Sequence, residues 1–409
     1  MIPVRCAIPP RVPSTTDPSE EHRAIPMRVV HIARRFAPML GGIERYVRDL
    51  TAAQVRDGHQ VTVVTLERDV IGDVPGRLPA TEIVDGVRVV RVPGVGNRRF
   101  AICLRPNVLF SEIRRAQVVH HHDLRFMTGL VAMTSAMVRR PLLVHTHGLL
   151  FHTPWAATVK ALAVRTYYGP LLRIGADRVI ASSDPDAELL EHYAPYLAAR
   201  TVTFDNATVL GPLLAVESRP EPGLIVTQGR IARHKGLDDL IRAVAEVKST
   251  EWRLEIGGTE DRDERERLSA IVRQTGIGDR VGFTGTYTDE DHLAQLGRAS
   301  LAVFPSHHEG FGLALLEAMG AGTPLLARDI PAHRFVLGPD LQDRLIRIDR
   351  PRDLAVAITR ELGMTPGQRV ALAERLRRRA ADFDIGRLVD QIDGLYTQLR
   401  APGAPAPGG

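Results

Sequence analysis

The sequence has few cysteines, few aromatic residues and no long hydrophobic run. Only two of its 409 residues are cysteine, and Cys6 and Cys103 lie too far apart to suggest a disulfide framework or a thiolate metal site. We therefore expect a protein of the reducing cytoplasm. Aromatic residues make up 5% of the chain, too few for the stacking platforms that bind bases, so no nucleic-acid partner is predicted. No stretch reaches the roughly 18 uninterrupted apolar residues of a transmembrane helix.

The overall composition and the length of the chain predict a globular protein of two domains. Hydrophobic residues make up 44% of the chain and charged residues 25%. A chain of 409 residues is too long for one ordinary hydrophobic core. The net charge of +5 comes largely from arginine, which suits the binding of phosphate groups or of an anionic membrane surface.

Short β-branched runs alternate with amphipathic helical patterns along most of the chain. Continuous apolar strands separated by such helices predict an α/β fold with parallel sheets covered on both faces, and the length allows two of them. The boundary between them is expected within residues 201–222, which are rich in proline and glycine. The expected strands are 29–32, 61–65, 87–92, 142–145, 178–181, 224–227, 254–256, 281–283 and 301–304.

Both ends of the chain differ in composition from the part between them. Residues 1–26 are rich in proline and charge, without the continuous apolar region of a secretory signal, and they predict a disordered extension. The folded part is expected to begin at Met27, which is itself a candidate start of the native protein. Residues 401–409 predict a disordered tail of proline and glycine.

Two glycine-containing loops follow expected strands, and ligands of open parallel sheets bind at that end of the strands. Gly41 and Gly42 open a helix after strand 29–32, where a close backbone approach and the helix terminus favour an anion. The alternative is a turn that only needs conformational freedom. Arg230 and Lys235 lie in the loop after strand 224–227 and would place two cations on a diphosphate. Here the alternative is a solvated basic loop.

The sequence of the loop that holds Arg230 and Lys235 excludes two common classes of nucleotide-binding protein. The segment 228–237 lacks the lysine followed by Ser or Thr of a nucleoside-triphosphate loop, and its glycine spacing is not a dinucleotide fingerprint. Kinase and dehydrogenase functions are therefore not predicted.

The segment 308–320 holds two carboxylates eight positions apart. Glu309 lies at the mouth of a strand-to-helix crevice, and Gly310, Phe311 and Gly312 lead into a helix whose first amides face the loop. On that helix Glu317 shares a face with apolar residues, where a buried carboxylate needs a partner. A ribose diol offers two donors, and an ion pair with a nearby arginine is the alternative.

Histidines recur at two strand ends. His120 and His122 share one face of a strand, as do His145 and His147. Hydrogen bonds to a sugar or its phosphate are favoured over a metal, because no helical histidine pair with a glutamate is present. Two acidic pairs also resemble chelating motifs, but they lie at expected helix starts, where aspartate caps amides; they are Asp184 with Asp186 and Asp261 with Asp263. No metal or other cofactor is predicted.

Together these motifs resemble the family 4 retaining glycosyltransferases of GT-B fold. The resemblance runs from Met27 to Arg400 and rests mainly on residues 229–236 and 305–324, with Gly41-Gly42, His147-Gly148 and Ser182-Ser183 in support. It implies two Rossmann-like domains facing across a cleft: an acceptor-binding domain at 27–205 and a nucleotide-sugar-binding domain at 206–382. A last helix at 383–400 would cross back to the first domain.

The resemblance also implies roles for individual residues. Arg230 and Lys235 would neutralise the donor diphosphate, and Glu317 would bind the ribose. Glu309 would contact the transferred sugar, aided by the amides at Phe311 and Gly312. His147 would lie against the same sugar, with Gly41 and Gly42 approaching from the same side. Fixed cations and a carboxylate would then stabilise opposite ends of one transition state without a metal. Glu309 is not assigned as a covalent nucleophile, because that would need a second carboxylate in reach.

The chain departs from the family pattern in two places. Residues 204–208 replace the usual Pro-Asn-Gly turn before the linker, so the hinge or its donor contacts are expected to differ. The loop 149–155 after His147 is unusually apolar and aromatic, which is compatible with a lipid-linked acceptor or with one that tolerates aromatic contacts. Basic and apolar residues also mix at 98–105 and 114–115, as contact with an anionic membrane requires; an ordinary solvated face is the alternative.

The prediction is a cytoplasmic enzyme, with the inner face of the cell membrane as a further hypothesis. It would transfer a hexose-type sugar from a nucleoside-diphosphate sugar to a hydroxyl of a glycan or lipid-linked glycan. Two rival hypotheses are a GT-B epimerase acting on a nucleotide sugar and a non-catalytic nucleotide-sugar-binding partner in glycan assembly.

Overall fold

The structure is a computed structural model, and it describes residues 25–39, 41–68, 76–96, 101–124, 126–147, 157–248, 251–259 and 262–400. The tail expected at 401–409 and nearly all of the extension expected at 1–26 lie outside these residues.

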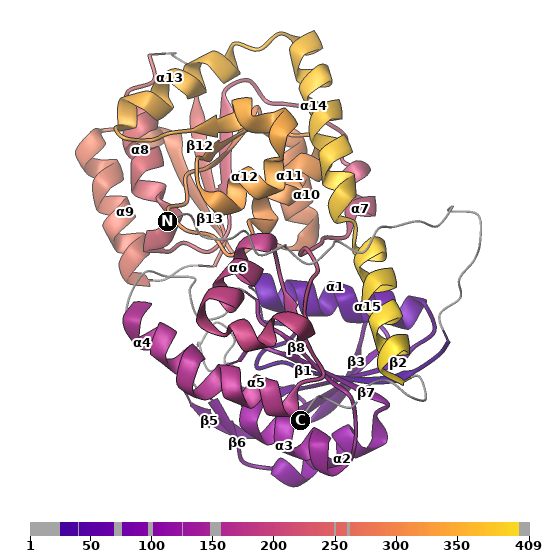
Figure 1. Ribbon diagram of the computed structural model, residues 1–409. Coiled ribbons are helices and arrows are strands. Elements are labelled where there is room, and N and C mark those ends of the chain that lie inside the picture. The colour runs from indigo at the N-terminus through magenta and orange to yellow at the C-terminus, as the bar shows by residue number, and fades with distance from the viewer. Residues whose placement is uncertain are drawn as a thin grey trace, which may run out of the picture.

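The first sheet has eight strands, ordered β10-β9-β8-β7-β1-β2-β4-β3. Neighbouring strands run parallel except β3, which pairs antiparallel with β4 at the edge. Helices α1 to α6 connect and cover this sheet (Figure 1). The strands are β1 (Arg28–Ile32), β2 (Gln60–Leu66), β3 (Thr81–Val84), β4 (Val87–Val92), β7 (Val118–His122), β8 (Leu142–His145), β9 (Arg178–Ala181) and β10 (Thr201–Thr203). The helices are α1 (Gly42–Arg56), α2 (Pro106–Arg115), α3 (Thr128–Met137), α4 (Ala157–Ala163), α5 (Gly169–Gly175) and α6 (Asp184–Tyr193).

The second sheet has six parallel strands, ordered β13-β12-β11-β14-β15-β16. Its strands are β11 (Leu224–Gln228), β12 (Arg253–Gly257), β13 (Val281–Gly285), β14 (Leu301–Phe304), β15 (Leu325–Arg328) and β16 (Leu345–Ile346). Its helices are α7 (Leu210–Leu214), α8 (Leu237–Ala245), α9 (Arg262–Thr275), α10 (Asp289–Arg298), α11 (Leu313–Ala321), α12 (Pro331–Leu337), α13 (Pro351–Leu362) and α14 (Pro366–Ala380). A short antiparallel hairpin, β5 (Gly94–Gly96) and β6 (Ala101–Cys103), lies apart from both sheets.

Apolar runs form these strands because helices cover each sheet on both faces. All four residues of β8 and of β14 are buried, as expected for central parallel strands. Each sheet separates two hydrophobic clusters, one on either face. The predicted doubly wound α/β plan with two sheets is confirmed, and each predicted strand appears with ends shifted by at most two residues.

The last helix, α15 (Ile385–Arg400), leaves the second domain and packs against α1 of the first (Figure 1). Its apolar stripe, which includes Leu388, Ile392 and Tyr396, is part of the same buried cluster as β1 and β2. A parallel bridge between Thr208 and Asp384 brings the two segments that connect the domains side by side.

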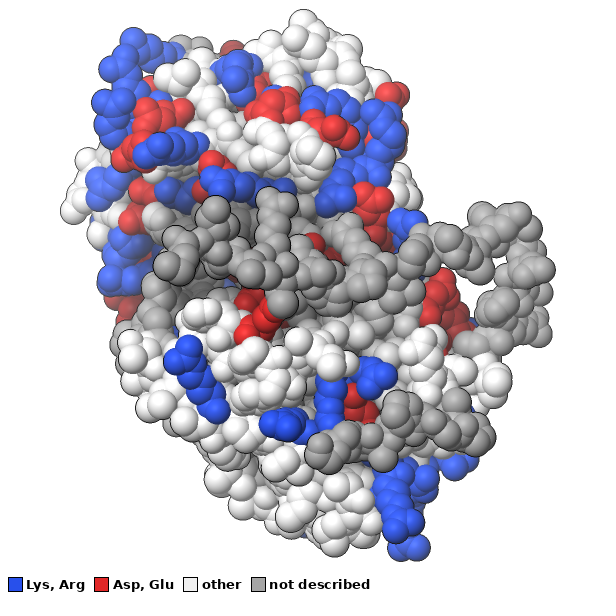
Figure 2. Space-filling model, viewed as in Figure 1, with Lys and Arg blue, Asp and Glu red and all other residues white. Residues whose placement is uncertain are grey.

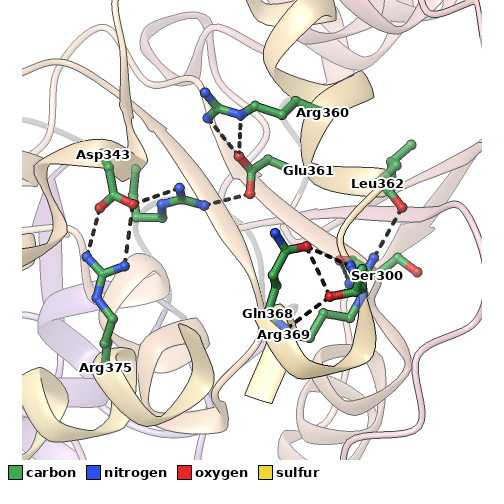
Figure 3. A network of polar contacts seen from close by, with 10 residues as sticks. Ser300, Asp343, Arg360, Glu361, Leu362, Gln368, Arg369 and Arg375 are labelled. Carbon is green, nitrogen blue, oxygen red and sulfur yellow. Dashed lines mark hydrogen bonds and ion pairs between the residues drawn. The ribbon is translucent and has the colours of Figure 1, made fainter. Parts of the chain in front are cut away.

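Arginine side chains donate hydrogen bonds that connect the outer helices of the second domain to their neighbours (Figure 3). Glu361 on α13 is 1% exposed, and it accepts hydrogen bonds from Arg344 at 2.6 Å and from Arg360 at 2.7 Å. Arg369 on α14 donates to the carbonyl oxygens of Ser300 and Leu362. Helix α14, which precedes α15, is therefore held to the second domain by the hydrogen bonds of Arg369 as well as by apolar packing.

Candidate functional site

One large cavity of about 1970 Å³ lies between the two domains, and residues of both line it. The lining segments follow the carboxyl ends of β1, β7, β8, β11 and β14, where ligands of open α/β sheets bind. The cavity brings together all of the residues predicted for the site: Gly41, Gly42, His147, Arg230, Lys235, Glu309, Gly310, Phe311, Gly312 and Glu317.

Lys235 and Glu309 form an ion pair on the second domain's wall of the cavity. Lys235 Nζ donates to Glu309 Oε1 at 2.7 Å, and the hydroxyl of Ser306 donates to the same carboxylate at 2.7 Å. Burial alone would raise the pKa of Glu309, but Lys235, His333 and these hydrogen bonds outweigh it and lower that pKa to about 2. Glu309 is therefore an anion at neutral pH and not a proton donor.

The loop between Glu309 and α11 turns sharply. Gly312 precedes the helix with φ 100°, a left-handed conformation that suits glycine, and a Cβ there would meet His333 Cδ2 at 3.4 Å. Phe311 is buried against Phe335 and Phe383, with ring centroids 6.1 and 5.6 Å apart. The aromatic anchor and the glycine set the path of the backbone beside Glu309.

Glu317 is paired with residues of both domains. Its Oε1 lies 3.3 Å from Nε of Arg45 on α1, and its Oε2 lies 3.1 Å from Nε2 of His292 on α10. Burial would raise the pKa of Glu317, but Arg45 and His292 lower it. The structure thus contains the ion pair weighed from the sequence as the alternative to ribose, and its arginine comes from the opposite domain.

Two predicted donor-site features occupy the edges of the cavity. Arg230 is exposed, and its loop lines the cavity beside Lys235. Gly41 and Gly42 begin α1, and a Cβ on Gly42 would come within 3.8 Å of Leu313 Cδ1 on α11. The glycine loop of the first domain therefore lies against the helix that carries Glu317.

His147 lies at the first domain's side of the cavity. It is 6% exposed and has φ 48°, a conformation uncommon for residues other than glycine and a cost that functional sites often carry. Its ring stacks on that of His145 at 3.9 Å, and its Nε2 lies 3.0 Å from His122 Nδ1. The histidine pairs predicted from strand periodicity are therefore neighbours, with His31 joining them from β1.

The buried histidines include two groups whose nitrogens lie within 4.8 Å of one another, close enough to hold a metal ion: His31, His120 and His122, and His122, His145 and His147. That the protein needs no metal stays a prediction.

The two acidic pairs predicted to cap helices differ in how much of each pair the structure describes. Asp186 is buried and accepts from the amide of Ser182, while Ser183 is the N-cap of α6. Asp263 lies in the first turn of α9, and Asp261 is outside the described residues.

The first domain adds an apolar wall to the cavity. Ile102, Leu130, Val159 and Tyr167 line it from β6, α3, α4 and the π-helical turn that follows α4. Of the acceptor region predicted from the sequence, Gly148 and the loop 149–155 lie outside the described residues, as do Arg98, Arg99 and Phe100.

Arg45 and His292 were not predicted as site residues. Arg45 lies directly after the Gly41 to Glu44 motif, but no sequence pattern shows that it reaches a carboxylate in the other domain. His292 stands alone on an amphipathic helix, which by itself indicates nothing.

Two α/β domains with a cavity lined by charged residues between them are the arrangement of the GT-B fold. Residues 41–207 match the model of the glycosyl transferase 4-like domain, and residues 215–381 match that of the glycosyl transferases group 1. The chain belongs to the family 4 glycosyltransferases of GT-B fold. Its donor substrate is a nucleotide sugar.

Relatives and solved structures agree with this assignment. The chain is 34% identical over 313 residues to the GDP-mannose:cellobiosyl-diphosphopolyprenol alpha-mannosyltransferase of Xanthomonas oryzae pv. oryzae, which covers 75% of this chain and 79% of that protein. The enzyme of the same name from Komagataeibacter xylinus is 29% identical over 388 residues, or 90% of this chain and 94% of the relative.

The fold matches Anabaena HepE in complex with UDP-glucose, with a TM-score of 0.73, 16% identity and coverage of 91% of this chain and 99% of that chain. It also matches sucrose-phosphate synthase from Thermosynechococcus elongatus, with a TM-score of 0.70, 22% identity and the same coverage.

Proposed function

We propose that the protein is a metal-independent, retaining hexosyltransferase whose acceptor is a hydroxyl of a lipid-linked glycan. The observation that carries the donor half of this proposal is the Lys235–Glu309 pair, which fixes one cation and one anion 2.7 Å apart in the interdomain cavity. Departure of a nucleoside diphosphate creates negative charge while the sugar becomes oxocarbenium-like. Both charges then have a fixed partner in the site.

In this mechanism Lys235 and Arg230 hold the diphosphate and stabilise the charge that develops on it. Glu309, an anion at neutral pH, accepts hydrogen bonds from the transferred sugar, and the amides around Phe311 and Gly312 fix its position. The acceptor hydroxyl attacks from the face on which the diphosphate leaves, and the leaving phosphate takes its proton. Two protein cations take the part that a metal plays in other transferases, so none is needed.

Glu317 is the proposed ribose ligand, and its carboxylate also contacts Arg45 and His292. A carboxylate can accept about four hydrogen bonds, and the ribose hydroxyls would compete with Arg45 for this group in an exchange of partners. Because Arg45 belongs to the first domain, the exchange would alter the contact between the domains. Arg45 also lies 3.6 Å from Asp289, which gives its guanidinium a second carboxylate in the second domain.

The apolar wall of the cavity supports a lipid-linked acceptor. Exposed apolar side chains of the same domain include Ile102 on β6, which also lines the cavity, and Ile174 on α5, at 61% and 80% exposure. On the face seen in Figure 2, the first domain, below, is mostly uncharged with a few basic and acidic residues, whereas the second domain above carries denser mixed charge. Within the described residues, no helix combines the length and apolar character that crossing a bilayer would require. We propose peripheral contact with an anionic membrane, at its cytoplasmic face.

The test of transfer uses radiolabelled GDP-mannose, the donor named in the relatives, with UDP-glucose as comparison and a short-chain diphosphopolyprenol disaccharide as acceptor. We expect a product that retains the α-anomeric configuration and forms in the presence of EDTA. If an epimer of the donor sugar forms in the absence of acceptor, the protein is an epimerase and not a transferase. Binding without any turnover would indicate a non-catalytic partner.

The membrane contact is tested separately by sedimentation with vesicles containing anionic lipid. The variant Ile174→Glu should bind the vesicles more weakly than the wild type. Val370→Glu is the matched control, because Val370 is also exposed, at 61%, but lies on α14 of the second domain. Equal losses in the two variants would reject a docking surface on the first domain.

A further inference from the structure

A chain of three histidines leads from the cavity into the interior of the first domain. His147 Nε2 lies 3.0 Å from His122 Nδ1, and His122 Nε2 lies 3.0 Å from His31 Nδ1. His31 Nε2 in turn lies 2.8 Å from Oε1 of Gln54 on α1. The three histidines come from β1, β7 and the end of β8, which are adjacent strands.

The rings meet end to end. The centroids of His31 and His122 are 5.3 Å apart with 11° between the ring planes, and those of His122 and His147 are 5.3 Å apart with 29° between them. With nitrogens at 3.0 Å, such separations are those of nearly coplanar imidazoles joined by N–H···N hydrogen bonds.

The inner end of the chain sets the direction of every bond. His59 Nδ1 accepts from the amide of Met27 at 3.1 Å, so His59 Nε2 carries the proton that it shares with Asp393 at 2.7 Å. Gln54 turns its amide nitrogen toward the same carboxylate, at 3.4 Å, and therefore its oxygen toward His31. His31 must then donate from Nε2 and accept at Nδ1.

A neutral imidazole donates from one ring nitrogen and accepts at the other, so the direction of the first hydrogen bond determines that of the next two. His122 donates from Nε2 to His31 and accepts at Nδ1, and His147 donates from Nε2 to His122. The unprotonated nitrogen of His147 is therefore Nδ1. Burial lowers the pKa of His31 to about 3, and burial followed by the neighbouring histidines lowers the pKa of His122 well below its ordinary value. The rings of His31 and His122 are therefore neutral at physiological pH, and each carries one proton.

We propose that Gln54, His31 and His122 are positioning residues that hold His147, a residue of the cavity wall, as its Nε2–H tautomer, in which Nδ1 is a hydrogen-bond acceptor. This inference rests on the proposed function, in which the donor binds in the interdomain cavity that His147 lines. A reversed chain would put a proton on Nδ1 and turn that acceptor into a donor.

The test compares two replacements of His31. In His31→Gln the amide oxygen can accept from His122 and the amide nitrogen can donate to Gln54, so the direction is kept. In His31→Leu the acceptor is lost while the volume is similar. Two-bond ¹H–¹⁵N spectra of histidine-labelled protein distinguish the tautomers, and the signals of His147 are those missing from a His147→Gln sample. Thermal unfolding of each variant checks that it is folded.

We expect the wild type and His31→Gln to show the Nε2–H tautomer of His147, and His31→Leu to show a mixture. The kcat/KM for the nucleotide-sugar donor should fall by about fivefold or more in His31→Leu, because fivefold corresponds to one lost hydrogen bond. In His31→Gln it should fall by less than about twofold. The two variants losing the same activity, or a wild-type His147 protonated on Nδ1, would overturn the proposal. Because the spectra need no donor, they remain decisive if the chain transfers a different sugar or none.

A metal ion is the competing occupant of these histidines, since His31, His120 and His122 have nitrogens within 4.8 Å of one another. An ion there would replace the proton between His31 and His122. Stoichiometric zinc or another divalent metal in the purified wild type, lost in His31→Leu, would therefore also overturn the proposal.

Discussion

Removing the charge of Lys235 should destabilise the protein in a manner that depends on pH. Lys235 is the cation that lowers the pKa of Glu309, and the two side chains are 20% and 15% exposed. In Lys235→Met the carboxylate would remain buried beside Ser306 and His333 without its ion-pair partner. A buried carboxylate without a cation is unfavourable, so its pKa should rise above the ordinary value.

The magnitude follows from the pKa of Glu309. A fall from the ordinary value of 4.5 to about 2 corresponds to about 3 kcal/mol of stability at neutral pH. Because water reaches both side chains and screens their charges, we reduce the expected contribution of the ion pair to the free energy of unfolding to about 2 kcal/mol. Because the folded pKa is the lower one, this stability is present above pH 4.5 and is lost as the pH falls toward 2.

Urea unfolding of the full chain at several pH values measures this effect. The variant should be about 2 kcal/mol less stable than the wild type at pH 7, and the difference should shrink as the pH falls below 4.5. Lys235→Arg is the control, since it keeps the charge. The reasoning would be refuted by a Lys235→Met variant as stable as the wild type at pH 7, or by a difference that does not change with pH. In the transferase assay the same variant should lose about 100-fold or more in kcat.

Four further predictions concern the domain contact and the cores. Glu317→Ala should weaken nucleoside-diphosphate binding by about tenfold or more in calorimetry, whereas Arg45→Met should bind at least as tightly as the wild type if Arg45 competes with the ribose; weaker binding would show that it assists instead. Glu361→Ala should cost about 3 kcal/mol in urea unfolding, because the buried guanidinium of Arg344 loses its buried partner and keeps only the more exposed Asp343. Ile392→Ala, in the fully buried stripe of α15, should cost about 2–5 kcal/mol, and a cost near zero would contradict the described packing.

Much of the fold was predictable because its signals are local. Apolar runs such as 142–145 and 301–304 gave their strands directly, since central parallel strands are buried on both faces. The site residues could be placed at strand ends for the same reason, and the side-chain period of two put His120 with His122.

What the sequence did not indicate depends on the order of strands and on contacts between domains. The placing of β1 beside β7 brings His31 to the histidines, and local pattern does not determine that neighbour. The pairing of Arg45 with Glu317 joins helices of different domains, so neither helix carries a sign of it. The short edge strands β3 and β16 lack the buried apolar runs by which the central strands were recognised.

The path of α15 also bears on how the chain is made in the cell. The first domain comprises the part of the chain synthesised first, yet Leu388, Ile392 and Tyr396 complete its buried cluster. Domains usually fold in the order in which they leave the ribosome. Here the first domain cannot close its core until residues 385–400 have emerged, by which time every strand of the second sheet is available. A nascent chain halted before α15 would therefore expose an apolar groove along α1, and it should be a preferred target for chaperones and proteases.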